Sequence, residues 1–325
     1  MTQYLCHCLG LACVKHSVRG EFVKKVSVGI CCYNEAANIE PMYRAVKHEL
    51  EKFPEYDYEI IFEDNASTDG SRQILRRISG GDSHVRAILN MANFGVERSG
   101  FNCMRKARGD AFLSIPCDFE EPPEMIPSFI DAWARGNSVV LGQKTSSDEG
   151  RIRYALRGLY YRIIDAFSDY KQIPQVTGFG IYDRKIVNLL LEILQYDPYI
   201  SARHILPEYG IEVLLIPYKH GHRLHGHSSY TLGSYLTFAI SSLCTTSTKP
   251  LRIITLTGLF GTICGTIACI VSAFFLPPVY VLLILLLAVV FLLMLGVGVV
   301  GEYLSVVLRK VTKKPAVVEL EEDDE

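Results

Sequence analysis

The 325-residue chain lacks several features that would place it in a familiar class of protein. Its ten cysteines include no C-x-x-C pair and follow no regular spacing, so we interpret them as reduced thiols. Neither sign of charge dominates, because 33 basic and 35 acidic residues leave a net charge of −2, which argues against a nucleic-acid partner. The apolar stretch 9–14 is shorter and less apolar than a signal-peptide core usually is, so we expect residues 1–25 to be an extension outside the folded domain or the result of a start codon placed too early.

Apolar sequence, in contrast, is abundant. Hydrophobic residues make up 49% of the chain, and the mean hydropathy of +0.18 is high for a soluble protein. Two uncharged apolar runs, 253–276 and 279–300, are each long enough to cross the ~30 Å hydrocarbon core of a bilayer as a helix. Pro277 and Pro278 supply a turn between them. We therefore predict a two-helix transmembrane hairpin over 253–300.

Basic residues flank these two runs. Arg252 precedes the first, and Arg309 and Lys310 follow the second. The positive-inside rule then predicts an integral protein of the cell (inner) membrane, with the preceding domain and both termini in the cytoplasm. The chain ends in the acidic run 319–325, which we expect to be a solvated, disordered part of a cytoplasmic tail, 301–325.

The sequence before the apolar runs alternates between β-rich and helical patterns. Apolar residues at helical spacing predict helices at 36–53 and 71–78. Short β-rich segments bounded by Gly, Asn or Asp predict strands at 26–32, 58–62, 85–89, 111–115, 138–141 and 211–216. This alternation predicts an α/β domain over 26–230 with a mostly parallel central sheet, followed by a juxtamembrane amphipathic segment, 231–252.

Carboxylates follow three of the predicted strands. Glu35 comes after the first strand, Asp64 ends the second, and Asp118 and Glu120 follow the fourth. The carboxyl ends of parallel strands form one crevice, so these acids are expected to converge. A helix cap would explain any single acid, but several converging acids repel one another unless a cation or ligand offsets their charge. A hard divalent ion, Mg²⁺ or Mn²⁺, held together with phosphate groups would provide this offset.

Nine short motifs in the chain resemble those of glycosyltransferase family 2, and of its membrane-anchored polyprenyl-phosphate sugar transferases in particular. This branch includes dolichyl-phosphate mannose synthase and the bacterial undecaprenyl-phosphate glucosyltransferases. The motifs are C-Y-N-E at 32–35, D-N-A-S-T-D-G at 64–70, N-F-G at 93–95, R-G-D at 108–110, D-F-E-E-P-P-E at 118–124, T-G-F-G-I-Y-D-R at 177–184, R-L-H-G-H-S-S-Y at 223–230, K-P-L-R at 249–252 and G-E-Y-L at 301–304. Their order along the chain is that of the family.

The resemblance implies a nucleotide-sugar-binding domain of the glycosyltransferase type A fold. It implies that Glu35 and Asp64 bind the ribose and base of the donor, and Asn93 is a further candidate contact to the nucleotide. Asp118 would bind the metal, with Glu120, where relatives usually have Gln, as a second ligand. The chain departs from the family pattern two residues before Asp118, where Pro116 replaces the usual first aspartate.

The acceptor implied by the resemblance is a lipid phosphate, which is already an anion and needs cations rather than a strong base. Arg151 and Arg153 lie in a basic, partly apolar segment that suits an interfacial helix, and we expect them to bind the acceptor phosphate. A solvated basic helix face is the alternative for either arginine. Arg223 corresponds to a family arginine over the donor diphosphate, which makes Asp118 and Arg223 the candidate catalytic residues.

Four histidines surround that arginine, and several histidines within a few residues can bind zinc. We argue against a metal site among His220, His222, His225 and His227, because no Cys or carboxylate accompanies them in the sequence. A solvated loop with one His near the diphosphate is the preferred interpretation.

The predicted function is inverting, metal-dependent transfer of a monosaccharide, glucose from UDP-glucose, to a polyprenyl phosphate such as undecaprenyl phosphate, for modification of a cell-envelope glycan or glycolipid. A mannose synthase using GDP-mannose and a catalytically weakened membrane scaffold are the alternatives. A processive polysaccharide synthase is disfavoured, because the Q-x-x-R-W sequence of such enzymes is absent. The expected partners are a nucleotide sugar, a polyprenyl phosphate lipid and the membrane, without nucleic acid, and a homo-oligomer is left open.

Overall fold

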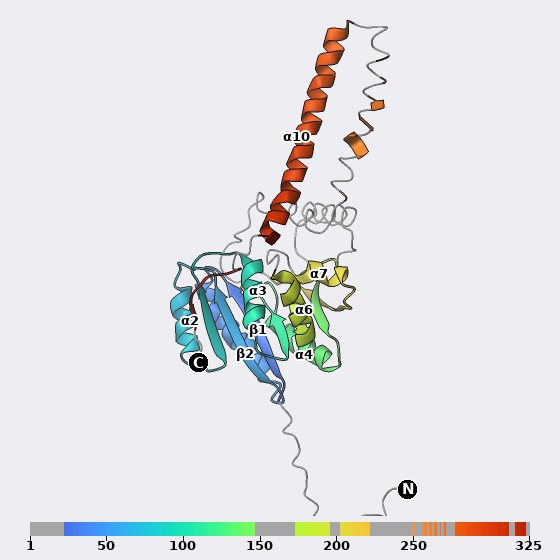
Figure 1. Cartoon of the computed structure of the whole chain (residues 1–325). Helices are drawn as coiled ribbons and strands as arrows, with labels where there is room; N and C mark the ends of the chain where they lie inside the picture. The colour runs from blue at the N-terminus through green and yellow to red at the C-terminus, as the bar shows by residue number, and fades with distance from the viewer. Residues whose placement is uncertain are drawn as a thin grey trace, which may run out of the picture.

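The computed structural model describes residues 23–146, 173–195, 202–221, 277–311 and 316–322, together with isolated positions between 249 and 270. In these residues a single mixed sheet runs through the domain with helices on both of its faces (Figure 1). The strand order is β7-β5-β6-β4-β1-β2-β3-β8. This is the predicted α/β arrangement.

The first half of the domain is the parallel part of the sheet. Its strands are β1 (Lys25–Cys32), β2 (Asp57–Asp64), β3 (Val85–Asn90) and β4 (Ala111–Ser114). β1 pairs in parallel with both β2 and β4, and β2 pairs in parallel with β3. The connecting helices are α1 (Ala36–Leu50), α2 (Ser71–Ser79) and α3 (Val96–Lys106). Each parallel pair therefore brings the carboxyl ends of its strands to the same edge.

The second half of the sheet is mixed. It consists of β5 (Val139–Ser146), β6 (Val176–Asp183) and β7 (Leu214–Lys219), with η1 (Pro123–Met125), α4 (Ile126–Ala134), α6 (Arg184–Leu194) and α7 (Ala202–Glu208) around them. β6 is antiparallel to β4 and to β5, whereas β5 and β7 are parallel. β6 was not among the predicted strands, because its sequence V-T-G-F-G-I-Y-D has no alternation of apolar and polar residues.

Two apolar layers hold the helices on the sheet. On one face the helical stripe predicted for 36–53 is buried, with Ile39, Met42 and Val46 each 0% exposed. On the other face α3 and α6 pack through residues such as Phe101 and Leu190. The sequence periodicity therefore predicted the inward face of α1 correctly, although this helix ends at Leu50, not at residue 53. The described cysteines are free thiols, as predicted.

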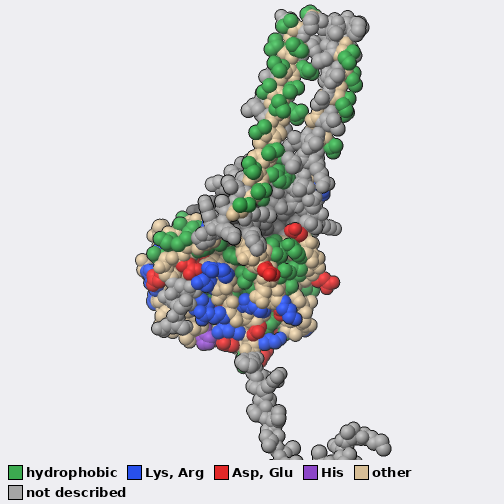
Figure 2. Space-filling model, in the orientation of Figure 1, with side chains coloured by type: hydrophobic (Ala, Val, Ile, Leu, Met, Phe, Trp, Pro, Cys, Tyr) green, Lys and Arg blue, Asp and Glu red, His purple; other side chains and the backbone are tan. Residues whose placement is uncertain are grey.

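The helix α10 (Pro278–Val311) extends away from the domain, and Figure 2 shows its apolar side chains in solvent. Leu282 and Val297, for example, are 64% and 71% exposed. A membrane span needs about 20 consecutive apolar residues in a helix. Among the residues whose side chains the structure describes, no helix has the length and apolar character to cross a membrane. The predicted integral-membrane localisation is therefore wrong on this finding, and the hairpin over 253–300 is unconfirmed.

The acidic end of the chain also differs from the disordered tail that was predicted. Residues Glu319–Glu322 form β8, which pairs antiparallel with β3 at the edge of the sheet. A disordered tail is therefore the wrong description for these four residues, because unpaired backbone groups of the edge strand β3 and nearby cations offer them partners. The predicted extension 1–25 and the segment 231–252 lie almost wholly outside the described residues.

Candidate functional site

The loops after β1, β2 and β4 lie at one edge of the sheet, as the parallel pairing requires. The last residues of β1 and β2, Cys32 and Asp64, are directly paired. Burial raises the pKa of the Cys32 thiol well above its usual range, so this sulfur stays protonated under the site. The acids predicted to converge thus start from neighbouring strands.

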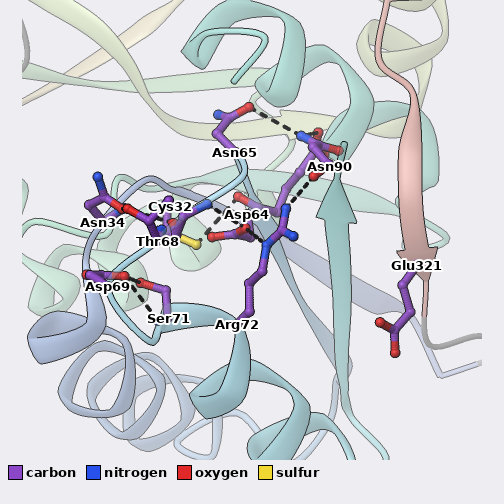
Figure 3. A network of polar contacts seen from close by, with 12 residues as sticks. Cys32, Asn34, Asp64, Asn65, Thr68, Asp69, Ser71, Arg72, Asn90 and Glu321 are labelled. Carbon is purple, nitrogen blue, oxygen red and sulfur yellow. Dashed lines mark hydrogen bonds and ion pairs between the residues drawn. The ribbon is translucent and has the colours of Figure 1, made fainter. Parts of the chain in front are cut away.

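Asp64 is fully buried, and its carboxylate organises the loop that follows β2 (Figure 3). Oδ2 accepts a hydrogen bond from the backbone N–H of Ser67 at 3.0 Å and one from Nε of Arg72 at 2.8 Å. The same guanidinium also donates to the backbone oxygen of Asn90. The other oxygen of Asp64, Oδ1, accepts no hydrogen bond from the described residues. Oδ2 of Asp64 is therefore held in place, and Oδ1 is available to accept a hydrogen bond from a ligand.

Side chains of one loop bond to the backbone of the other, so the loops after β1 and β2 are tied together (Figure 3). Asn34 has a φ of 55°, and its Oδ1 accepts the N–H of Thr68 at 2.9 Å. Asp69 accepts the N–H of Ala36 at 2.9 Å and the hydroxyl of Ser71 at 2.6 Å. The left-handed backbone at Asn34 is one that Asn tolerates better than most residues. These bonds position Asn34 and the start of α1 without any ligand.

Asn65 joins this pair of loops to the loop after β3. Its Oδ1 accepts from the hydroxyl of Ser99 at 2.7 Å and from the N–H of Phe94 at 3.3 Å. The buried amide of Asn90 donates to the same oxygen at 3.3 Å and to Oε1 of Glu63 at 3.0 Å. Neither Asn65 nor Asn90 was predicted to be a site residue. The D-N-A-S-T-D-G motif contains Asn65, but nothing in the sequence marks Asn90 as its partner.

Glu63 lies beneath these loops and is 0% exposed. Burial raises the pKa of its carboxyl group to about 8, against the weaker opposing effect of hydrogen bonds from Asn90 and neighbouring side chains. Its Oε2 has no hydrogen-bond partner among the described residues. Glu63 is therefore a neutral acid near pH 7 and supports the network by accepting from Asn90.

The two remaining donor candidates lie nearer the surface. Glu35 is half-buried at the start of α1 and accepts a hydrogen bond from the side-chain amide of Asn38. Asn93 is exposed and accepts the N–H of Gly95 at 3.0 Å, which forms the turn predicted at 93–95. Both side chains can be reached from solvent, whereas contact between Asp64 and a ligand requires movement of the surrounding loop.

The loop after β4 carries the predicted metal ligands. Asp118 is 9% exposed, and its Oδ1 accepts the backbone N–H of Glu120 at 3.1 Å. Phe119 between them has a φ of 64°, so the backbone turns sharply and the two acids do not extend in strand fashion. The side chain of Glu120 instead meets the end of β7, where His220 Nε2 lies 3.4 Å from its Oε2.

Glu120, Glu121 and His220 together form a group that can hold a metal ion. Ligand atoms of the three residues lie within 4.8 Å of one another. Asp118 does not belong to this group. Carboxylates that are distant in sequence lie beside His220 in the fold, so the absence of nearby acids in the sequence does not exclude His220 as a metal ligand. Nothing in the sequence indicates this contact, because the loop after β4 and the end of β7 are about a hundred residues apart.

Glu121 is held by side chains of three strands. Its Oε1 accepts from the hydroxyls of Thr177 and Tyr218 at 3.1 and 3.2 Å, and Lys144 Nζ lies 3.4 Å away. Burial, with a contribution from Glu121, raises the pKa of Tyr218, so this hydroxyl remains a donor. Glu121 thus fixes β6 and β7 against the loop, and Glu120 and His220 face each other beside it.

Three predicted residues, Arg151, Arg153 and Arg223, lie outside the described residues. The structure brings Glu35 and Asp64 to one sheet edge with Asp118 and Glu120, while Asn93 reaches this edge through Asn65. The described part of this sheet edge therefore combines backbone turns with acidic side chains. Arg72 is committed to Asp64 and Asn90.

Curated relatives match most of this chain. It is 27% identical over 299 residues to the SfII prophage-derived bactoprenol glucosyl transferase of Shigella flexneri, covering 90% of this chain and 96% of that protein. A prophage bactoprenol glucosyl transferase homolog of Escherichia coli (strain K12) is 26% identical over 302 residues, with 90% and 97% covered. Both alignments extend well beyond the α/β domain.

Among solved structures, the fold is similar to glucosyl-3-phosphoglycerate synthase of Mycobacterium tuberculosis. That comparison has a TM-score of 0.47 at 16% identity and covers 69% of this chain and 81% of the other. The family description Glycosyl transferase family 2 matches residues 27–190, a range that begins in β1, ends in α6 and includes the acid-bearing loops. The chain therefore belongs to glycosyltransferase family 2 and is a glycosyltransferase.

Proposed function

We propose that this enzyme transfers a glucosyl unit from UDP-glucose to a polyprenyl phosphate, with inversion at the anomeric carbon. The observation that carries the proposal is the match, over 90% of the chain, to a bactoprenol glucosyl transferase and to a homolog of such an enzyme. The family match alone would support only sugar transfer, because it covers only residues 27–190. The alignment of the remaining residues supports a shared acceptor.

The donor nucleoside binds, in this proposal, across the loops after β1, β2 and β3. Glu35 and Asn93 offer accessible acceptors for ribose hydroxyls. Asp64 has a buried oxygen without a hydrogen-bond partner among the described residues, and leaving such an oxygen unpaired costs about 1 to 3 kcal/mol. An N–H or hydroxyl of the nucleoside would satisfy it once the loop 65–70 moves. The existing contacts of Asp64 to Ser67 and Arg72 limit how far this loop can shift.

We assign the donor diphosphate to the loop after β4. Carboxylate oxygens and one imidazole nitrogen suit Mn²⁺, and Mg²⁺ would use the carboxylates with water and phosphate oxygens. The residues present fit such an ion: Glu120 and His220 have ligand atoms in one group, and Asp118 lies two residues before Glu120. When bound, the ion would neutralise the charge that develops on the leaving diphosphate. The proline at 116 removes one family acid, and His220 supplies a ligand from β7 in its place.

The reaction itself needs little proton transfer. The acceptor phosphate is an anion at neutral pH, so positioning and charge stabilisation account for the rate enhancement. Its oxygen attacks the anomeric carbon while the bond to the nucleoside diphosphate breaks, which inverts the configuration. Arg151 and Arg153 are proposed to bind the acceptor phosphate, and Arg223 the donor diphosphate, as the family resemblance implies.

Transfer assays with the full-length enzyme test this proposal. UDP-glucose, UDP-galactose and GDP-mannose are each incubated with undecaprenyl phosphate and Mn²⁺, and the lipid product is identified by mass spectrometry. We expect a polyprenyl-phosphate hexose from UDP-glucose that disappears in EDTA and is absent when the lipid carries no phosphate. A product from GDP-mannose alone would overturn the donor, and transfer to a soluble phosphate instead of the lipid would overturn the acceptor.

A further inference from the structure

The strand β8 lies beside the donor loops although it comes from the end of the chain. It pairs with Leu89 and Asn90 of β3, and Met91 donates its N–H to the backbone oxygen of Val318 at 3.0 Å. β3 would otherwise be an edge strand with one row of unpaired backbone groups among the described elements. β8 therefore covers the edge of the sheet at the point where the donor loop after β3 begins.

The side chains of β8 hold it there mainly through Glu319. This carboxylate accepts from the side-chain amide of Asn102 at 3.0 Å and pairs with Arg105 at 3.3 Å and Lys106 at 3.1 Å. Its side chain is 21% exposed. These partners come from the last turn of α3, where cations are favoured, and the basic residues gather on the face that α2 and α3 border (Figure 2).

The second anchor, Glu321, is weaker. It forms an ion pair with Arg76 on α2 at 2.5 Å, but the two side chains are 41% and 44% exposed. Exposed pairs contribute little because water and salt screen them. Glu319 is therefore the residue on which the docking of β8 chiefly depends.

The segment of β3 that β8 covers belongs to the donor network (Figure 3). The backbone oxygen of Asn90 accepts from Arg72, which in turn holds Asp64 at 2.8 Å. The amide of Asn90 donates to Asn65, and Asn65 holds the N–H of Phe94 next to Asn93. An unbroken chain of contacts thus leads from β8 through Asn90 to both sides of the nucleotide site.

We propose that Glu319 is a positioning residue for nucleotide binding: by docking β8 on β3, it fixes Asn90 and, through Asn90, the loops that carry Asp64 and Asn93. The inference rests on the proposed function, because it requires a nucleotide donor. Binding of the nucleotide and docking of the strand are then coupled, and each stabilises the other by the same factor. Screening by salt weakens the contacts of Glu319 and so should weaken nucleotide binding as well.

The test compares Glu319→Gln with Glu321→Gln in the full-length protein, because both remove one carboxylate from the same strand and the pair of Glu321 with Arg76 is exposed. UDP and GDP are titrated by calorimetry at low and high salt, and amide hydrogen exchange is followed over residues 85–95. For Glu319→Gln we expect faster exchange at Leu89 to Met91, about fivefold weaker binding of the nucleotide that the wild type prefers, and a raised donor KM with kcat unchanged. Glu321→Gln should change all three less than Glu319→Gln does, because water and salt screen its exposed pair with Arg76.

Two outcomes would overturn the inference. Faster exchange with unchanged nucleotide affinity would show that β8 docks without positioning the site, and unchanged exchange would show that Glu319 does not hold the strand. Titrating both nucleotides separates this inference from the proposed donor: a wild type that prefers GDP changes the donor and leaves the comparison of variants intact. A wild type that binds neither nucleotide would count against both proposals.

Discussion

The loops after β2 and β4 both carry acids at the same sheet edge, but they are built in opposite ways. The loop after β2 is fixed by contacts with residues that lie between positions 34 and 99, and its bonds form among consecutive βα units. The loop after β4 acquires its shape from the end of β7. Gly221 donates its N–H to the backbone oxygen of Glu120 at 2.8 Å, and a Cβ there would come within 2.7 Å of the oxygen of Phe119.

We call the loops after β1, β2 and β3 the preorganised half of the site, and the group of Glu120, Glu121 and His220 the assembled half. The donor loop has its geometry as soon as β1, β2 and β3 pair. The Glu120 and His220 contact exists only when β7 has joined β5 and brought its last residues back to the loop after β4. Changes in the assembled half should therefore remove chemistry and leave the fold intact, whereas changes in the preorganised half should affect both stability and donor binding.

The largest expected effect is on the assembled half. Glu120→Gln removes the charge from the member of the metal group whose Oε2 lies 3.4 Å from His220 Nε2. We expect transfer to fall by about 10² to 10³-fold, the range for losing one group that stabilises developing charge. Initial rates at saturating Mn²⁺ measure it, and electron paramagnetic resonance of added Mn²⁺ reports binding directly.

Glu124→Gln is the matched control, since Glu124 is an exposed acid at the start of η1, four residues further along the chain. It should retain wild-type rates and Mn²⁺ binding. Full activity of Glu120→Gln in the presence of EDTA would show that this loop holds no catalytic ion.

The second prediction concerns the pH dependence of stability and tests the preorganised half. Burial raises the pKa of Glu63 to about 8 from the usual 4.5, so between these values the folded chain keeps a proton that the unfolded chain has lost. The contribution of Glu63 to stability is therefore fully present below pH 4.5, decreases as the pH rises through this window, and is lost above pH 8. The expected loss across the window is about 5 kcal/mol.

Glu63→Gln keeps an acceptor for Asn90 and cannot titrate. Urea unfolding of both proteins at several values between pH 5 and pH 8 should show a decline in the wild type that is smaller in the variant. If the two curves run parallel, Glu63 is ionised in the fold and the network beneath the donor loops must be satisfied in another way.

The third prediction is for Asp64→Asn, which removes the charge that orients Arg72. A hydrogen bond to a charged group contributes about 1.5 to 3 kcal/mol, so we expect a tenfold to hundredfold lower kcat/KM, mainly through the donor KM. Asp57→Asn is the control, because Asp57 begins the same strand at the opposite end and pairs with Lys25 in an exposed contact. Equal effects of the two variants would indicate general destabilisation of β2 and not a role in donor binding.

Part of the preorganised half could be predicted from the sequence. The period-3.6 stripe of α1 and the β-rich runs determine the parallel half, so Glu35 and Asp64 were correctly expected at one edge. Asn90 was missed because its role comes from a neighbouring strand, and no local pattern distinguishes it from any polar strand end.

The assembled half could be predicted only in part. The acids after β4 were identified by motif, but the contact of Glu120 with His220 depends on the path of the chain between β4 and β7, which includes an antiparallel strand without a clear pattern. The strand β8 was missed for a related reason. A run of six acids among seven residues, 319–325, is typical of a solvated tail, and only the cations of α2 and α3 make an edge strand favourable there.

The smallest expected effect concerns backbone geometry in the preorganised loop. Gly70 has a φ of 97° immediately before α2, and a Cβ at this position would meet no atom within 4 Å. Gly70→Ala should therefore destabilise the protein through backbone conformation alone, by about 1 to 2 kcal/mol. Gly100, inside α3, also has open space around it, but its helical backbone suits alanine, so Gly100→Ala should stabilise by about 0.5 to 1 kcal/mol. Thermal unfolding of the two variants should thus give shifts of Tm of opposite sign. A rise in Tm for Gly70→Ala would mean that the loop after β2 adopts another backbone conformation in solution, and that the donor half is less preorganised than its hydrogen bonds indicate.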